Sequence, residues 1–380
     1  MNTSQETKQL RFKTGDVIHL GSHILFCNDS TKVDLSSVGE IHAIVTDPPY
    51  ELGFMGKSWD ASGIAYNTEL WRECLRVLKH GGHMLAFSGS RTYHRMVVAI
   101  EDAGFEIRDQ IMWLYGSGFP KSLNIDKAID KAAGAEREVV GQKITGNART
   151  DEGWAGGQIT IDETAPATAA AQQWDGWGTA LKPAHEPMVL ARKPVVGTIA
   201  NNVLTYGVGG LNIDGSRVGT EEVLGRPQST NSADNPFHKG LQNNGINNYS
   251  DQVGGRFPAN FIHDGSDEVV ALFPITTSGA NKPDFNRDNS IFGFGGGQGF
   301  SDSGSAARFF YCAKASKRDR NEGLDGFEAK RDHDGRKDGG VGGDNPRNRT
   351  NNAKVNHHPT VKPTTLMQYL VRLVTPPNGI

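Results

Sequence analysis

The chain is poor in cysteine: only Cys27, Cys74 and Cys312 occur among its 380 residues, and no two of them form a Cys-x-x-Cys pair. This pattern predicts neither a disulfide framework nor a zinc site, and it favours a reducing compartment. The sequence also lacks an apolar run long enough to cross a bilayer, and its polar start lacks the apolar centre of a signal peptide. We therefore expect a soluble, cytoplasmic protein that binds no metal.

Net charge is small as well, because 40 Lys and Arg stand against 43 Asp and Glu, a formal net charge of −3. The composition thus excludes an overall basic surface, and any contact with nucleic acid must be local. A dinucleotide-binding loop is missing too. Residues 292–300 are rich in glycine but contain no Gly-x-Gly-x-x-Gly in any frame, and they follow a polar loop. We interpret them as a flexible recognition loop.

What the chain does contain is a short apolar segment that stops at two prolines. Residues 41–50 read Ile-His-Ala-Ile-Val-Thr-Asp-Pro-Pro-Tyr, and their apolar, β-branched start is typical of a buried strand. Pro48 and Pro49 end the strand, because proline donates no ladder hydrogen bond. Asp47 precedes a proline and is therefore expected to be extended, at the carboxyl end of the strand. Ligands bind at that edge of an open α/β sheet.

These residues suit the methylation of an exocyclic amine, which is a poor nucleophile because its lone pair is delocalised into the ring. The Asp47 carboxylate and the Pro48 carbonyl can each accept an N–H hydrogen bond and draw the nitrogen toward a more nucleophilic geometry. Tyr50 is suited to stack on a base that has been swung out of the duplex. Catalysis would then rest on positioning and electrostatics. The alternative is a chance Pro-Pro turn after a strand.

Asp-Pro-Pro-Tyr is also the catalytic motif of the amino-group DNA methyltransferases, and the chain resembles this family over most of its length. It is most similar to the permuted subgroup, common in phages and prophages, in which the catalytic half precedes the cofactor half. Three further segments carry the resemblance: residues 78–91, residues 100–113, and His-Pro-Thr-Val-Lys-Pro at 358–363.

The resemblance implies a site-specific enzyme that transfers a methyl group from S-adenosylmethionine to adenine N6 in double-stranded DNA after base flipping, as in restriction–modification. Asp rather than Ser at the head of the motif favours adenine N6, with cytosine N4 as the runner-up. The implied catalytic residues are Asp47, Pro48, Pro49 and Tyr50. The implied cofactor-binding residues are Asp29, Asp47, His358, Thr360 and Lys362.

The periodicity of the first third predicts a doubly wound, Rossmann-like α/β fold. We expect a hairpin (17–20 and 24–27), the strand before Asp47, helices over 67–79 and 92–103, and strands over 84–87 and 111–115. Gly81-Gly82 is expected to end the first helix. Residues 1–116 would form the catalytic half, residues 117–356 the target-recognition insertion, and residues 357–380 the start of the cofactor-binding half.

Two loops near the motif leave alternatives open. Residues 53–63 are rich in glycine and contain Phe54, Met55 and Trp59, so they predict either a mobile flap over the flipped base or a loop with anchoring aromatics. The family places an acidic residue near the adenosine end of the cofactor at the position of Asp29. The other interpretation is that Asp29 caps the following turn or helix.

The stretch 117–356 has little regularity, with short strand-like islands at 188–191, 203–206, 260–263 and 307–312. Residues 164–173 are of low complexity and predict a surface linker. The resemblance places target recognition in this stretch, and we expect recognition loops that order on DNA rather than plain disorder. Residues 313–320 carry a local charge of +3 after a strand. The four basic residues predicted to contact DNA phosphates are Lys314, Lys317, Arg318 and Arg320; the alternative is a solvated charge run.

The C-terminal segment predicts a helix over 364–374, with Thr364 as its cap and Ile380 as the start of the next strand. In the family, that strand leads into the Gly-containing loop that holds S-adenosylmethionine, and the sequence stops before it. We therefore expect that a missing C-terminal segment or a second chain completes the cofactor site, or that the protein is degenerate. Two other classes stay open. One is a DNA-binding fragment without catalysis. The other is a methyltransferase that acts on a glutamine side chain of a protein; enzymes of that group usually carry Asn in place of Asp47.

Overall fold

The computed structural model describes residues 12–53, 58–118, 122–150, 153–219, 255–278, 302–313, 316–324, 326–327, 355–356 and 361–380. The predicted 292–300 loop lies outside these residues. Within them, none of the helices combines the length and apolarity of a membrane-spanning segment.

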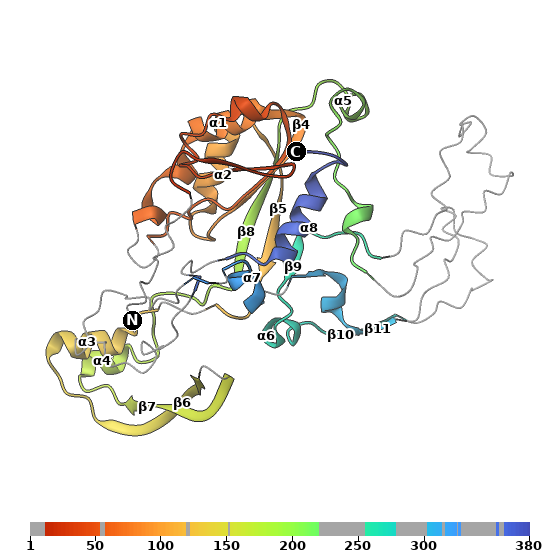
Figure 1. Cartoon of the computed structure of the whole chain (residues 1–380). Coiled ribbons are helices and arrows are strands. Elements are labelled where there is room, and N and C mark those ends of the chain that lie inside the picture. The colour runs from red at the N-terminus through yellow and green to blue at the C-terminus, as the bar shows by residue number, and fades with distance from the viewer. Residues whose placement is uncertain are drawn as a thin grey trace, which may run out of the picture.

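Six strands of the described chain form one mixed sheet (Figure 1). Their order across the sheet is β12 (Tyr311–Cys312), β9 (Phe261–His263), β5 (Glu106–Leu114), β8 (His185–Arg192), β4 (Leu78–Phe87) and β3 (Ile41–Thr46). All neighbours are parallel except β8, which runs antiparallel to both β4 and β5. The amino end of β8 therefore lies at the same edge as the carboxyl ends of β3, β4 and β5.

Helices cover both faces of this sheet, as expected for an α/β fold (Figure 1). On one face, α1 (Thr68–Val77) and α2 (Tyr93–Asp102) pack through buried Trp71, Met96 and Ile100. On the other face, α8 (Thr364–Val374) buries Leu366 and Leu370 against the strands. Side chains alternate between the faces along β4, and this alternation places the sheet between two apolar layers.

The remaining elements lie around this core. The hairpin of β1 (Val17–Leu20) and β2 (His23–Phe26) precedes it, and β10 (Ile275–Ser278) pairs with β11 (Asp302–Ser305). A long hairpin, β6 (Val139–Thr150) and β7 (Gly153–Thr164), lies with α3 (Ile125–Ala133) and α4 (Ala169–Gln173) away from the sheet (Figure 1). The other helices are α5 (Ile199–Tyr206), α6 (Asp267–Val270) and α7 (Lys317–Asn321). Short 3-10 turns cover Leu35–Val38, Ser58–Ala61, Ile64–Tyr66, Asp214–Ser216 and Ala306–Phe309.

The α/β class, the first hairpin, the alternating helices and strands of the first third, and the 364–374 helix are confirmed. Three strands of the sheet, β8, β9 and β12, come from the stretch 117–356. The predicted domain bounds stay a prediction. At the outer edge of β3, the Ile380 carbonyl accepts hydrogen bonds from the backbone N–H groups of His42 (2.6 Å) and Ala43 (3.3 Å). Ile380 thus lies where the sequence predicts the start of a neighbouring strand.

The role predicted for Gly81-Gly82 is wrong. Helix α1 ends at Val77, and β4 begins at the next residue, Leu78, so both glycines lie inside a strand. Gly81 has φ +84°, and a Cβ on Gly82 would lie 2.8 Å from the His42 carbonyl oxygen. The register between β3 and β4 shifts at this point. The two glycines therefore allow a close approach of two strands at an irregular pairing, which Cβ atoms would block.

The strand-like island at 203–206 is also wrong, because these residues belong to α5. The hydroxyl of Thr198 accepts a hydrogen bond from the backbone N–H of Asn201, which caps the start of the helix, and Gly207 ends it at φ +74°. Asn202 is fully buried and donates to the carbonyls of His80 and Val208. Capping residues at both ends and a buried amide thus outweigh the β-branched composition.

Three smaller predictions need correction as well. Residues 164–173 are not simply a linker, because Thr168 caps α4 and Ala171 is fully buried. Residues 307–312 begin as a 3-10 turn, and only Tyr311–Cys312 pair as a strand. Thr364 does not cap α8 with its side chain; instead its backbone N–H donates to the Asp319 carboxylate (3.0 Å). For Thr364 the deciding contact is a distant one, which the local pattern does not contain.

Candidate active site

The Asp-Pro-Pro-Tyr segment follows β3 directly and lies at the edge where β4 and β5 end and β8 begins. The turn after β4 is joined to β8 there, because the Ser88 N–H donates to the Pro187 carbonyl (2.9 Å). The sequence prediction that Asp47 lies at the carboxyl end of a sheet strand is therefore confirmed. Side chains from four strands and from the segment before α8 meet at this edge.

One lysine joins two carboxylates at this edge. The Lys362 ammonium lies 2.9 Å from Oδ2 of Asp47 and 3.2 Å from Oε2 of Glu186. The Lys362 side chain is only 7% exposed, whereas Glu186 is 17% and Asp47 29% exposed. A cation this buried needs partners to offset its lost hydration. The Asp47 carboxylate also interacts with the Tyr50 phenol.

Tyr50 is held at each of its polar groups. Its backbone N–H donates to Oδ1 of Asp60 (2.8 Å), and its carbonyl accepts from the Thr92 hydroxyl (2.7 Å). Its phenol donates to Oε2 of Glu186 (2.7 Å). Burial, together with the negative charges of Glu186 and Asp47, raises the pKa of Tyr50 well above its usual value. The phenol is therefore neutral and serves as a donor over the whole physiological pH range.

Aromatic rings surround the lysine. The Lys362 ammonium lies 5.2 Å from the ring centroid of Tyr50 and 5.0 Å from that of Phe87. These distances are typical of cation–π contacts, which offset part of the desolvation of the ammonium. Tyr115 lies nearby on the same edge, and burial followed by the charge of Glu186 raises its pKa to about 12.

The residue after the motif adopts an unusual backbone conformation. Glu51 has φ +57°, which is uncommon for a residue with a side chain. Its carboxylate accepts hydrogen bonds from the Ser62 hydroxyl and from the backbone N–H groups of Gly63 and Ala65. Asp60 reciprocates by accepting from the backbone N–H of Glu51 (3.1 Å). The described part of the predicted flap is thus hydrogen-bonded to the Asp-Pro-Pro-Tyr motif and to Glu51. Phe54 and Met55 lie outside the described residues, and mobility stays a prediction.

The sequence analysis missed Glu186, Asp60 and Thr92. A signal for Glu186 exists, because it precedes Pro187 just as Asp47 precedes Pro48, and a residue before proline is held extended. The antiparallel direction of β8 then places this carboxylate beside Asp47. No comparable signal marks Asp60 or Thr92, whose roles depend on tertiary contacts with Tyr50.

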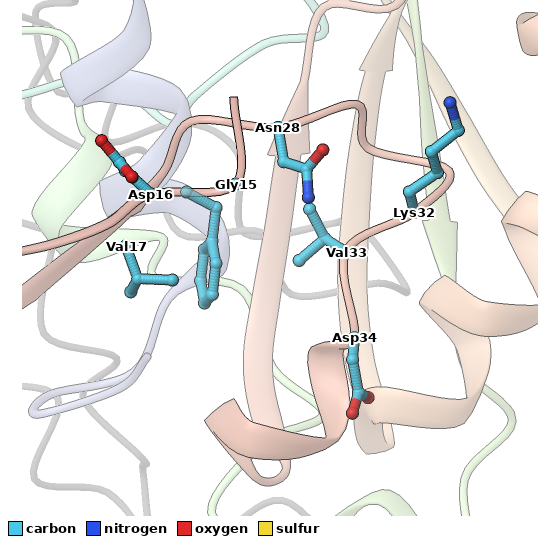
Figure 2. Close-up of a pocket in the computed structure, with 8 residues that line it drawn as sticks. Gly15, Asp16, Val17, Asn28, Lys32, Val33 and Asp34 are labelled. Atoms are coloured by element: carbon cyan, nitrogen blue, oxygen red, sulfur yellow. The ribbon is translucent and has the colours of Figure 1, made fainter. Parts of the chain in front are cut away.

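Asp29 makes a local turn. Its Oδ1 accepts from both the backbone N–H (3.0 Å) and the hydroxyl (2.8 Å) of Thr31, and these bonds lower the pKa of its carboxyl. This geometry agrees with the turn-capping interpretation, while a role toward the cofactor stays a prediction. The neighbouring residue Asn28 lines a small hollow of about 210 Å³. Figure 2 shows this hollow between the start of the first hairpin and the segment that ends at Asp34.

The predicted DNA-binding residues and the rest of the cofactor set are placed only in part. Arg318 is exposed on α7 and pairs with Glu322 (2.5 Å), so its charge is already partly neutralised. Lys314, His358 and Thr360 lie outside the described residues, as do the side chains of Lys317 and Arg320. The described residues bring Lys362 and Asp47 together, and they leave Arg318 on a separate helix.

Part of the chain is similar to known DNA methylases. Residues 41–194 match a family model for DNA methylases of the N6/N4 type. The type II methyltransferase M.HindIII of Haemophilus influenzae is 30% identical over 148 residues, which are 38% of this chain and 37% of that protein. The chain thus spans little more than a third of the length of this curated relative.

Two solved structures are similar over part of the chain. The crystal structure of M1.HpyAVI is 15% identical, with a TM-score of 0.22 over 44% of this chain and 53% of that one. The M1.HpyAVI–SAM complex is 13% identical, with a TM-score of 0.20 over 42% and 47%. Over residues 41–194, which hold Asp47, Tyr50 and Glu186, the chain resembles the amino-group DNA methyltransferases.

Proposed function

We propose that the chain takes part in methyl transfer from S-adenosylmethionine to an exocyclic amine of a DNA base, with adenine N6 as the target. The observation that carries the proposal is the site geometry. Oδ2 of Asp47 is held by Lys362, whose ammonium also lies 5.2 Å from the centroid of the Tyr50 ring. This arrangement offers a flipped base an acceptor for its amine and an aromatic surface for its ring.

The residues present can activate an amine without forming a covalent bond to it. Asp47 accepts one N–H of the amine, and the rigid Pro48 carbonyl is suited to accept the other. Both acceptors favour the developing positive charge on nitrogen more than the neutral amine, so they stabilise the transition state over the ground state. Tyr50 supplies the stacking contact that holds a base outside the duplex.

The charge of the site fits a cationic methyl donor. Two carboxylates, Asp47 and Glu186, stand against one ammonium, Lys362, which leaves one net negative charge at the edge of the sheet. S-adenosylmethionine supplies an electrophilic methyl group on a positively charged sulfur, and a negative site favours its approach. Among the described residues, Asp47 and Lys362 are the proposed contacts of this donor, and Asp29 remains a candidate for its adenosine end.

We choose adenine N6 over cytosine N4 because Asp heads the motif. The stretch 117–356 is proposed as the target-recognition region, with double-stranded DNA as the partner. The long β6–β7 hairpin lies in this stretch and extends away from the sheet (Figure 1).

The direct test is incorporation of labelled methyl groups into unmethylated double-stranded DNA of mixed sequence, followed by digestion and nucleoside analysis. N6-methyladenine is the expected product, and N4-methylcytosine would transfer the proposal to the runner-up. Binding of labelled S-adenosylmethionine, measured in parallel, identifies the third possibility. A chain that binds DNA but neither binds the donor nor methylates the DNA is a binding fragment, and the proposal then fails.

Tyr50→Ala tests the stacking role once a methylated site is known. A 2-aminopurine at the target position is expected to brighten on binding to the parent protein and to respond less to the variant, because stacking on a ring contributes about 1–3 kcal/mol per base. Overall DNA affinity is expected to change less, since phosphate contacts remain. Equal brightening with both proteins would mean that Tyr50 is only a core residue.

A further inference from the structure

We propose that Glu186 is a positioning residue that fixes both halves of the base-binding site, the Asp47 acceptor and the Tyr50 ring. The inference rests on the proposed function for its consequence in methyl transfer, and on the contacts of Glu186 for its structural content. Glu186 would act through Lys362 and Tyr50 rather than on the substrate itself.

The contacts among Glu186, Lys362, Asp47 and Tyr50 form a closed ring, which we call the circuit. Oε2 of Glu186 accepts from the Tyr50 phenol (2.7 Å) and lies 3.2 Å from the Lys362 ammonium, which in turn lies 2.9 Å from Asp47. Asp47 and Tyr50 are joined through the backbone of the two prolines between them. A single oxygen atom of Glu186 thus sets the position of the cation on one side and of the aromatic ring on the other.

Glu186 is itself firmly placed. It lies in β8, directly opposite Trp113 of β5 in the antiparallel register, and Pro187 follows it. Its side chain is 17% exposed. A carboxylate on a central strand of the sheet is held more rigidly than one on a loop, which is the requirement for a residue that orients others.

Two separable effects follow from removal of this carboxylate. The Lys362 ammonium keeps only Asp47 as an ionic partner and is free to turn toward it, competing with an incoming amine. The Tyr50 phenol loses its acceptor in a buried position, where an unsatisfied donor is unfavourable. Glu186→Gln retains an oxygen for Tyr50 but removes the charge that holds Lys362, whereas Glu186→Ala removes both.

The first experiment needs no DNA. The full chain is treated with an amine-reactive reagent, and the labelling rate of Lys362 is followed by peptide mass spectrometry. Glu186→Gln and Glu186→Ala are expected to raise this rate, by about tenfold for Ala, because one charged hydrogen bond is lost. Tyr50→Phe is expected to leave it nearly unchanged. Glu106→Gln, which alters the ion pair at the other end of β8, is the matched control.

Melting temperatures show whether each variant is folded before its rate is compared. The proposal is overturned if Lys362 reacts equally fast in the parent and in folded Glu186→Gln, or if Glu106→Gln raises the rate as much. These results would mean that the circuit does not hold the lysine in solution.

The second experiment measures methyl transfer for Glu186→Ala, Tyr50→Phe and the double variant. If Glu186 acts through the phenol, Tyr50→Phe adds no more than about twofold to the loss already caused by Glu186→Ala. Independent, multiplying losses would overturn that half of the proposal. An inactive parent would instead refute the proposed function, and the labelling of Lys362 would still decide whether Glu186 positions the site.

Discussion

Charged side chains cluster at both ends of β8, but the ratio of carboxylates to cations is opposite at the two ends. At the amino end, Lys362 lies between Glu186 and Asp47, with two carboxylates for one cation. At the carboxyl end, Glu106 faces Arg192 (2.5 Å) and Arg108 (3.9 Å), with two cations for one carboxylate. The central cations are buried alike, since Lys362 is 7% and Arg192 8% exposed.

The ends differ in how they are assembled. Glu106 and Arg192 lie directly opposite each other in the antiparallel register of β5 and β8, so strand pairing alone brings them together. Lys362 lies 315 residues away from Asp47 in the chain, and the two side chains meet only in the folded protein. Asp47 itself follows a strand and precedes a proline. A cross-strand ion pair such as Glu106–Arg192 stabilises the pairing of the two strands. An excess of negative charge, assembled from distant segments at one edge of the sheet, is not needed for strand pairing and is typical of a binding site.

The strongest test of this contrast is Asp47→Ala. We expect methyl transfer to fall on the order of a hundredfold or more, because one preorganised acceptor for the amine is lost. Stability is expected to change little, because Lys362 keeps Glu186 as a partner. The measurement is methyl incorporation into duplex DNA, with DNA binding as the control. Activity within a few-fold of the parent would remove Asp47 from the catalytic role.

His83 makes the opposite end sensitive to acid. Burial, followed by the charges of Arg192 and Arg108, lowers the pKa of His83 from 6.5 to about 4. The unfolded chain therefore binds a proton at His83 more readily than the folded one. This site leaves the free energy of unfolding at its full value above pH 6.5 and lowers it as the pH falls toward 4. The shift corresponds to about 3 kcal/mol. Denaturant unfolding between these pH values measures it, and His83→Gln is expected to flatten the dependence. An equal slope in both proteins would assign the effect to other groups.

Glu106→Ala is expected to show the reverse of Asp47→Ala: the free energy of unfolding falls, and the rate of methyl transfer changes little. It leaves Arg192 buried without its carboxylate, and since Glu106 is 37% exposed we expect a cost of about 2 kcal/mol, less than for a fully buried pair. Unfolding free energy and methyl transfer are measured on the same preparation. If Glu106→Ala kept its stability but lost methyl transfer, the carboxyl end of β8 would not be purely structural, and the proposed difference between the two ends would be wrong.

The smallest expected effect is that of Thr92→Val. This change removes the hydroxyl that donates to the Tyr50 carbonyl, at 2.7 Å, while preserving shape. We expect a loss of about 1 kcal/mol in unfolding free energy, as for one neutral hydrogen bond. The Lys362 labelling rate should stay at the parent value, because Glu186 still holds the ammonium. A faster rate would show that the backbone of Tyr50, and not only Glu186, maintains the circuit.

Local patterns were sufficient where they carried a signal with one physical meaning. The prolines at 48 and 49 predict both the end of β3 and the place of Asp47, and the C-terminal pattern predicts α8 with its bounds at 364–374. Patterns failed where the meaning depended on context. Gly81-Gly82 serve a close strand approach instead of a helix end, and Thr364 is capped from outside by Asp319.

The sequence by itself determined the strand end at Asp-Pro-Pro-Tyr, the alternation that produces an α/β sheet, and the resemblance that this motif carries, because proline, β-branching and periodicity act over a few neighbouring bonds. Only the tertiary structure decided that β8 runs antiparallel and brings Glu186 beside Asp47, and that Lys362 lies between them. Strand order and long-range ion pairs are set by the packing of the whole sheet, in which each contact depends on segments far apart in the chain. Short-range rules do not contain that information.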